Sequence, residues 1–300
     1  MPGPRRFPLP LIAAFFALYV IWGSTYLVIR IGVEYWPPLM LGGIRFLVAG
    51  LAMYGFLRWR GAPAPTWVQW KAAAKIGVLL LTFGNGAVTV AEHTGVASGV
   101  AALAVATVPL FTLLCGYFWG ARNTRLEWAG VLLGIIGIAM LNMGSNLQSS
   151  PTGAMLLLFA AASWAFGSVW SRHLPLPPGA MASAAEMIIA GVLLLVGSAL
   201  TGERLHSIPP IEGWLALAYL AVFGSIIAFN AYMYLLKHVR PAAATSYAYV
   251  NPAVAVLLGI VFVGETIGME EALAMLVIIS AVLLISLPQW RKPKPKPEIR

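Results

Sequence analysis

The sequence has no aspartate, one cysteine and few charged residues of either sign. Its 10 acidic residues are all glutamates, and together with 19 Lys and Arg they make up 10% of the 300 residues. Metal, phosphate or acid–base sites that need an aspartate are therefore excluded. Cys115 alone can form neither an internal disulfide nor a thiolate cluster for zinc or iron–sulfur chemistry. We expect no metal site and no cofactor.

Most of the chain is instead apolar. Hydrophobic residues make up 60% of it, whereas soluble globular domains contain about 45–50% apolar and about 25% charged residues. A soluble core could not bury this much apolar surface. The composition therefore indicates an integral membrane protein.

The apolar residues fall into ten runs of the length that a membrane helix needs, which is about 20 residues. The runs cover residues 9–29, 38–57, 71–91, 97–119, 126–143, 152–171, 180–200, 212–236, 241–263 and 270–287. Only short connections and two tails remain between and beyond them. We therefore predict an all-α polytopic membrane protein with ten transmembrane helices.

The basic residues indicate how these helices cross the membrane, since positively charged short loops stay cytoplasmic. If the N-terminus is cytoplasmic, the outer side holds only Arg30 and Arg204, Arg45 lies inside a run, and every other Lys and Arg falls on the inner side. A wrong number of spans would disrupt this alternation. Both termini are therefore predicted to be cytoplasmic.

The two halves of the chain resemble each other. Trp22 matches Trp164 at a shift of 142 residues, and Pro109 matches Pro252 at a shift of 143. Each half contains five runs, and because five is odd, the second half enters the membrane from the opposite face. Inverted repeats of this kind are characteristic of secondary transporters. We divide the chain into a cytoplasmic tail (1–8), a first repeat (9–145), a second repeat (146–288) and a basic cytoplasmic tail (289–300).

Two short segments suggest a family. The early run Ile21-Trp22-Gly23-Ser24 and the late run Tyr249-Val250-Asn251-Pro252, set in two halves of five spans, resemble the EamA branch of the drug/metabolite transporter superfamily. The chain is most similar to bacterial YddG-type exporters of aromatic amino acids. The resemblance covers nearly the whole chain, although its motifs are loose patterns. It implies a substrate cavity between the halves, export from the cytoplasm and a place in the bacterial inner membrane.

Polar residues inside the runs are candidates for the cavity wall, because polar side chains at mid-bilayer should face protein or water. The third run carries a polar stripe at helical spacing that includes Thr82 and Asn85. Gly84 and Gly86 flank Asn85 and leave space for a neighbour or a substrate, which favours the cavity for Asn85. Thr82 can equally bond to an adjacent helix.

Aromatic residues lie deep in the first and sixth runs. Trp22 and Tyr26 share one side of the first run, and Trp164 and Ser168 lie four residues apart in the sixth. Trp164 is about 12 residues into its run, roughly 18 Å along the helix, which is too deep for an interfacial anchor. Its indole can pack in the core or form an aromatic wall for a ligand.

The ninth run differs from its partner in the first half. Tyr247 and Asn251 lie four residues apart on one face, where the first half has Ala104 and Val108. Folding would allow symmetry here, so the added polar groups indicate function. Asn230 in the eighth run is a further candidate. Tyr249 points to another side and is expected to bond to a neighbouring helix.

Two charges and two prolines lie within the runs. Arg45 is expected to extend towards the outer surface or pair with Glu34. Glu186 is either a coupling site for protons or a hydrogen-bonded structural acid. Pro109 and Pro252 each remove a helix hydrogen bond, which makes either a hinge or a fixed bend.

The sequence excludes ATP-driven pumping, because it has no phosphate-binding loop and no aspartate to hold magnesium. We therefore predict a secondary transporter that exports aromatic or other neutral amino acids by alternating access of a central cavity. Its partners are the small-molecule substrate, the lipid bilayer and, if transport is coupled, protons, with no nucleic acid. The alternative is a multidrug or other metabolite exporter of the same superfamily.

Two further classes are weaker alternatives. An intramembrane enzyme is disfavoured because the four histidines, His93, His173, His206 and His238, fall at span ends or in loops. A structural membrane subunit should show faces of small residues four apart. Gly130 and Gly134 fit that pattern, but they equally suit close packing within the monomer.

Overall fold

The structure is a computed structural model that describes residues 9–93, 104–141, 151–205, 207–254 and 269–290, and it contains helices but no strand within those ranges. The first repeat contributes α1 (Leu9–Tyr35), α2 (Pro38–Trp59), α3 (Trp67–Gly77), η1 (Val78–Asn85), α4 (Gly86–His93), α6 (Val108–Gly116), η2 (Tyr117–Trp119) and α7 (Arg125–Leu141). The second contributes α8 (Pro151–Trp170), η3 (Ser171–His173), α9 (Ala180–Leu200), α10 (Ile211–Tyr219), η4 (Leu220–Phe229), α11 (Asn230–His238), α12 (Pro241–Ala244) and α14 (Met269–Trp290).

These helices follow the order of the ten apolar runs, with the fourth, fifth and ninth runs described only in part. Five helices are long and apolar enough to cross a membrane by themselves, namely Pro38–Trp59, Trp67–Ala91, Thr152–His173, Ala180–Leu200 and Ile211–His238. The first helix counts as a sixth if its two parts, which meet at a bend of 40°, form one span. Val108–Trp119 and Ala272–Pro288 are shorter apolar helices. The prediction of an all-α polytopic membrane protein is confirmed.

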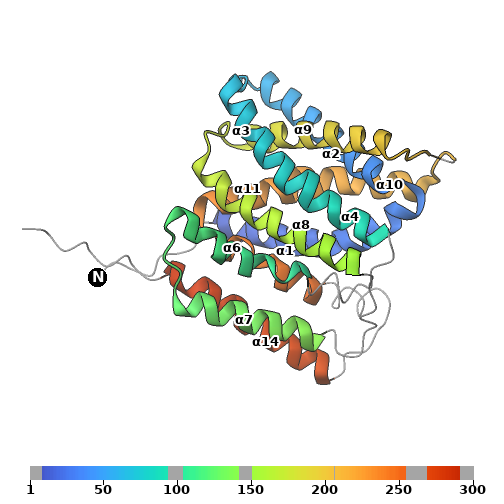
Figure 1. Ribbon diagram of the computed structural model, residues 1–300. Coiled ribbons are helices and arrows are strands. Elements are labelled where there is room, and N and C mark those ends of the chain that lie inside the picture. Colours follow the sequence, from blue (N-terminus) through green and yellow to red (C-terminus); the bar gives the residue numbers. More distant parts are fainter. Residues whose placement is uncertain (1–8, 94–103, 142–150, 206, 255–268, 291–300) are drawn as a thin grey trace, which may run out of the picture.

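The helices lie side by side in a bundle (Figure 1). The pair α7 and α14 forms one flank of the view, α2, α3 and α9 form the opposite flank, and α1, α8 and α11 lie between them. Glycines allow the closest contacts. A Cβ on Gly191 of α9 would lie 2.5 Å from the backbone nitrogen of Leu47 on α2, so a side chain there would force the helices apart.

The pairing of helices follows the internal repeat. The second and seventh spans pack together as α2 and α9, and the fifth and tenth as α7 and α14. Gly130 of α7 packs on Ile285 of α14, and Gly134 packs on the ring of Tyr249. The small residues of α7 therefore serve contacts within the chain.

The third and eighth spans are each interrupted by a π-helix in the same place. η1 begins at Val78 and η4 at Leu220, which are related by the same shift of 142 residues as Trp22 and Trp164. A π-helical stretch misaligns the backbone hydrogen bonds and is often found at functional sites. Side chains from neighbouring helices donate hydrogen bonds to backbone carbonyls of these two π-helices. The indole of Trp22 donates to Gly224 O at 3.0 Å, and Ser163 Oγ donates to Leu79 O at 2.8 Å.

Polar side chains accept hydrogen bonds from backbone N–H groups at the starts of two helices, α2 and α7. Glu203, in the loop after α9, accepts hydrogen bonds from the backbone N–H groups of Leu39 and Met40 at 3.1 and 2.9 Å, so a carboxylate complements the N-terminus of α2. Thr124 and Glu127 form a reciprocal capping box at the start of α7, with contacts of 2.7 and 3.2 Å. From the sequence, Glu127 falls in the first turn of the fifth run, which predicts that its carboxylate complements the helix N-terminus, and the contacts confirm this role.

Candidate substrate cavity

A cavity of about 90 Å³ lies where the two repeats meet. Residues from both halves line it, as in transporters whose substrate site lies between two repeats. The first half contributes Trp22, Thr25, Ile29, Arg45, Phe46, Leu81, Gly84, Asn85, Val88, Val105 and Val108. The second half contributes Ala160, Ala161, Trp164, Gly224, Phe229, Tyr247 and Asn251.

Five of the nine residues that the sequence suggests for the cavity wall line this cavity. They are Trp22, Asn85, Trp164, Tyr247 and Asn251. Thr82, Ser168 and Asn230 lie outside the lining, and the side chain of Tyr26 lies outside the described part of the structure. The depth of the tryptophans and the asymmetry of the ninth span were therefore useful guides to position.

Four aromatic rings pack together at the cavity, and three of them, Trp22, Trp164 and Tyr247, line it. We call Trp22, Trp164, Tyr232 and Tyr247 the aromatic cluster. Trp22 lies at the centre, with ring centroids 5.6 Å from Trp164, 5.3 Å from Tyr232 and 4.9 Å from Tyr247. Edge-to-face and tilted contacts of this length are favourable aromatic geometries. The rings therefore support one another and offer π-faces to an apolar or aromatic ligand group.

Tyr232 is the member of the aromatic cluster that sequence reasoning missed. Its side chain is fully buried, its hydroxyl accepts a hydrogen bond from the indole N–H of Trp164 at 2.9 Å, and it lies 2.5 Å from Ser168 Oγ. Ser168 thus supports the cavity wall from behind. The spacing of Phe229, Tyr232 and Leu236 on one face of the helix is the signal that would have found it.

Asn85 presents a hydrogen-bond acceptor without a partner. Its side-chain Oδ1 is buried, lines the cavity and has no hydrogen bond among the described residues. Asn85 ends η1, and its backbone carbonyl already accepts a hydrogen bond from Thr89 at 3.0 Å. Thr82 Oγ1, one turn earlier, is also buried without a described partner, so a bond from Thr82 to an adjacent helix is not seen. An unsatisfied buried oxygen facing a cavity suits a ligand N–H group.

Arg45 corrects a prediction. Its side chain is only 5% exposed and lines the cavity, with its guanidinium 4.3 Å from the ring centroid of Phe46. It therefore does not extend to the outer surface. The position of Arg45 in its run indicates its depth along α2 but not the direction of its long side chain. Arg45 and Asn85 both line the cavity, so its wall holds a buried guanidinium as well as a buried amide oxygen.

Asn251 ties the ninth span to the first. With its amide nitrogen facing the two carbonyls, it donates to Tyr247 O at 3.2 Å and to Tyr19 O at 3.3 Å. The hydroxyl of Tyr19 lies 2.7 Å from Ser246 Oγ on the same segment. Tyr249, two residues from Asn251, donates to Val131 O of α7 at 3.3 Å, as its different orientation predicts. Asn251 is therefore held in place by protein groups as well as lining the cavity.

The remaining candidates have local roles that the contacts make plain. Asn230 donates to Ile226 O at 2.6 Å and contacts the sulfur of Met53 at 3.2 Å. Pro109 lies in the first turn of α6, where proline removes no helix hydrogen bond, and a break in the helix precedes it. Pro252 lies within a helical stretch that begins at Tyr247. Their action as hinges stays a prediction.

Glu186 is fully buried, and both of its carboxyl oxygens lack a hydrogen-bond partner among the described residues. It lies on α9, outside the lining of the cavity. A hydrogen-bonded structural acid, one of the two roles that the sequence suggested, is therefore not what the structure shows.

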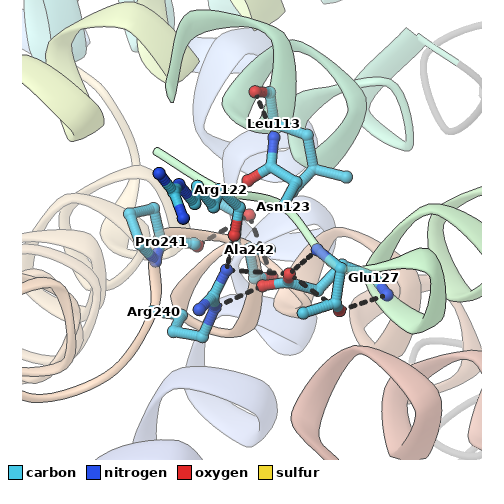
Figure 2. A network of polar contacts seen from close by, with 9 residues as sticks. Leu113, Arg122, Asn123, Glu127, Arg240, Pro241 and Ala242 are labelled. Atoms are coloured by element: carbon cyan, nitrogen blue, oxygen red, sulfur yellow. Dashed lines mark hydrogen bonds and ion pairs between the residues drawn. The ribbon is translucent and has the colours of Figure 1, made fainter. Parts of the chain in front are cut away.

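An ion pair joins the repeats at the end of the bundle that carries Arg122, Lys237 and Arg240, which we call the basic end (Figure 2). The guanidinium of Arg240 contacts both carboxylate oxygens of Glu127, at 2.5 and 2.8 Å, and also donates to Arg122 O at 2.9 Å. Glu127 is 1% exposed and Arg240 is 37% exposed. Bidentate pairs of this kind are strong and geometrically specific. The sequence identified the capping role of Glu127 but not this partner 113 residues away.

The chain is similar to known membrane transporters. The model of the EamA-like transporter family matches residues 9–143 and again 151–287. The uncharacterized inner membrane transporter YedA of Escherichia coli (strain K12) is 56% identical over 285 residues, which is 95% of this chain and 93% of that protein. The probable amino-acid metabolite efflux pump of Salmonella typhimurium is 28% identical over 273 residues, or 86% and 89% of the two chains.

One crystal structure has the same fold, with a TM-score of 0.76 and 22% identity, and the match covers 94% of this chain and 99% of the other. The double match to one family model confirms the two-repeat architecture that the sequence predicted. The family and the relatives are transporters, which excludes an enzyme. The chain belongs to the EamA-like transporter family.

Proposed function

We propose that this protein exports aromatic or other neutral amino acids across the bacterial inner membrane by alternating access of the cavity. One observation supports the substrate class above all: the cavity lining combines a buried cation, Arg45, a buried acceptor, Asn85 Oδ1, and three rings of the aromatic cluster. A cation suits a carboxylate, a carbonyl oxygen suits an ammonium group, and aromatic faces suit an apolar side chain. These are the three parts of an aromatic amino acid.

The relatives agree with this chemistry at a coarser level. One of them is named as a probable amino-acid metabolite efflux pump, and another is named as an inner membrane transporter. A multidrug exporter for planar cations is the alternative within the family. The buried charge of Arg45 disfavours it, because a cation in the cavity would face a like charge at low dielectric.

The size of the cavity indicates which state of the transport cycle the structure represents. At about 90 Å³ it is smaller than the roughly 300 Å³ at which ligand pockets begin. The cavity must therefore widen to admit an amino acid. We take the structure as a contracted form, and we expect the repeats to separate at one end when substrate enters.

The basic end is the cytoplasmic end in this proposal, because short basic loops stay inside. The Glu127–Arg240 ion pair then links the two repeats on the cytoplasmic side. In the internal repeat, Ala97 is the counterpart of Arg240, and Glu270 is the counterpart of Glu127. The opposite end therefore lacks the cation for an equivalent pair. Opening towards the cytoplasm requires the Glu127–Arg240 contact to separate.

Exchange across proteoliposomes tests the substrate class. Vesicles loaded with unlabelled L-phenylalanine should take up labelled L-phenylalanine, and other aromatic amino acids should compete better than nucleosides or cationic dyes. Asn85→Leu should raise the concentration of aromatic amino acid needed for half-maximal competition about tenfold, since hydrogen bonds to charged groups contribute about 1.5–3 kcal/mol.

Trp59→Phe is the matched control for aromatic substitutions, because Trp59 is 80% exposed at the end of α2. It should leave exchange unchanged, whereas Trp164→Ala should reduce it strongly. Equal exchange by the Trp164→Ala, Asn85→Leu and parent proteins at equal expression would refute the proposed site. Strong competition by dyes with none by amino acids would transfer the proposal to a drug exporter.

A further inference from the structure

We infer that Glu186 is the proton-binding site that drives transport, an inference that rests on the proposed exchange of amino acids through the cavity. Glu186 lies on α9, away from the cavity lining. A titratable group inside a membrane helix that serves no structural contact is a candidate for coupling.

The surroundings of Glu186 favour a neutral acid. Both carboxyl oxygens are buried without a hydrogen-bond partner among the described residues, and so is the hydroxyl of Ser183 one turn earlier on the same face of α9. An ionised carboxylate in such packing would be heavily penalised, whereas a protonated carboxyl is tolerated. The packing therefore fits Glu186 with its proton bound.

Among the charged and titratable groups on the helices around Glu186, one acts on it electrostatically. The helices packed against α9 are α2, α3, η1 and α11. They carry Arg45, Tyr54, Arg58, Lys71, Lys75, Tyr232, Tyr234, Lys237 and His238, and η1 carries none. Glu186 forms no hydrogen bond with these groups in the described structure, but it lies within electrostatic range of Lys237. Lys237 is exposed at the basic end, so a deprotonated Glu186 would be drawn in that direction.

The backbone at Glu186 is in direct contact with the segment that forms the cavity. A Cβ on Gly77 would lie 2.6 Å from the carbonyl oxygen of Glu186, so α9 and α3 touch with no side chain between them. Gly77 is the residue immediately before η1, and η1 carries Leu81, Gly84 and Asn85 of the cavity wall. A shift of α9 on deprotonation would therefore act on the π-helix that holds Asn85.

These contacts define an exchange of one proton for one substrate. The carboxyl of Glu186 binds a proton when the cavity is open to the outside, and the contracted form carries it. When the basic end opens, the O–H bond breaks, the proton passes to cytoplasmic water and the carboxylate turns towards Lys237. Substrate then binds, and its export allows Glu186 to take up the next proton from outside.

Proteoliposomes with an acidic interior and no membrane potential separate coupling from transport. The parent protein should accumulate labelled L-phenylalanine up to about tenfold across one pH unit, as expected for one-for-one exchange. Glu186→Gln, which mimics the neutral acid, should keep exchange of labelled for unlabelled L-phenylalanine at equal pH but show no accumulation. Glu212→Gln, an exposed residue of α10, is the matched control and should accumulate label like the parent.

Accumulation by Glu186→Gln equal to the parent would overturn the inference, and so would exchange by the parent with no response to the pH gradient. If the parent exchanges no amino acid at all, the proposed substrate fails, and a second readout still tests Glu186. The infrared carbonyl band of a buried protonated carboxyl should be present at pH 7 in the parent and in Glu212→Gln and absent in Glu186→Gln. An unchanged band in Glu186→Gln would refute the proton site independently of substrate.

Discussion

The ion pair between Arg240 and Glu127 should hold the basic end closed, and its removal should open that end measurably. Arg240→Gln and Glu127→Gln each remove one charge. Glutamine at position 127 can still complete the capping box with Thr124, so this change spares the start of α7 while it removes the pair.

The magnitude follows from the burial of the two partners. Exposed ion pairs contribute about 0–1 kcal/mol, and breaking a buried pair costs about 3–5 kcal/mol. Glu127 is 1% exposed and Arg240 is 37% exposed, so an intermediate value of about 2 kcal/mol is reasonable after allowance for solvent screening. That corresponds to a change of roughly 30-fold in the ratio of open to closed molecules.

Accessibility of a buried thiol measures this ratio. Ala244 is fully buried on α12, three residues beyond Pro241, and Ala244→Cys in a Cys115→Ala background gives one reporter. A membrane-impermeant maleimide applied from the basic side should label it about 30-fold faster when Arg240→Gln is added. Glu127→Gln should have a similar effect, and the double variant should be no faster than either, because both remove the same contact.

Arg58→Gln is the matched control, since Arg58 lies at the same end and, within the part of the chain that the structure describes, donates its hydrogen bond to Ala62 O of its own repeat. It should leave the labelling rate unchanged. Equal rates for the parent, Arg240→Gln and Glu127→Gln would refute the role of the ion pair in closure. Strictly additive effects of the two substitutions would show that they act separately.

Two further predictions follow from the cavity and the helix contacts. Arg45→Gln should raise the concentration of L-phenylalanine needed for half-maximal competition by about 10–100-fold. The same change should have little effect on competition by phenethylamine, which has no carboxylate for Arg45 to bind. Equal losses for both compounds would contradict carboxylate recognition. Gly134→Ala should lower the free energy of unfolding by about 1–3 kcal/mol, because its Cβ would lie 2.6 Å from the ring of Tyr249. Gly55→Ala, which meets nothing within 4 Å, should be neutral or stabilising in the same thermal unfolding assay, and a stable Gly134→Ala protein would argue against this packing.

The fold was readable from the sequence because a bilayer imposes simple rules. Long apolar runs, basic inner loops and the shift of 142 residues between Trp22 and Trp164 are one-dimensional patterns. The two π-helices were not predictable in this way, because η1 and η4 have the apolar composition of ordinary helices. The division of the chain at residues 145 and 146 lies outside the described residues and stays a prediction. The predicted basic tail 289–300 begins two residues too early, because α14 runs to Trp290, and its residues 291–300 lie outside the described part.

The cavity lining was predictable where the depth of a residue or the asymmetry between the repeats marks its position. Trp164 is too deep to anchor at an interface, and Tyr247 and Asn251 have no counterparts in the first half. Arg45 and Tyr232 were missed for different reasons. A long cationic side chain can turn inwards or outwards from the same depth, and a tyrosine on an apolar helix face resembles packing until its hydroxyl partners are known.

The Glu127–Arg240 pair could not be inferred from spacing, because the partners come from different repeats and meet only after the chain has folded. The capping role of Glu127 could be predicted because it needs only a carboxylate in the first turn of a helix. Glu186 illustrates the opposite case. The sequence indicates the residue, and among the described residues its carboxyl has no hydrogen-bond partner that would support the structural role.

A structure with L-tryptophan bound tests most directly whether the cavity between the repeats is the transport site. The account predicts an enlarged cavity with the ligand's carboxylate facing Arg45, its ammonium facing Asn85 Oδ1 and its ring against Trp22 and Trp164. Ligand bound elsewhere, or bound with Asn85 and Trp164 turned to the lipid, would contradict it.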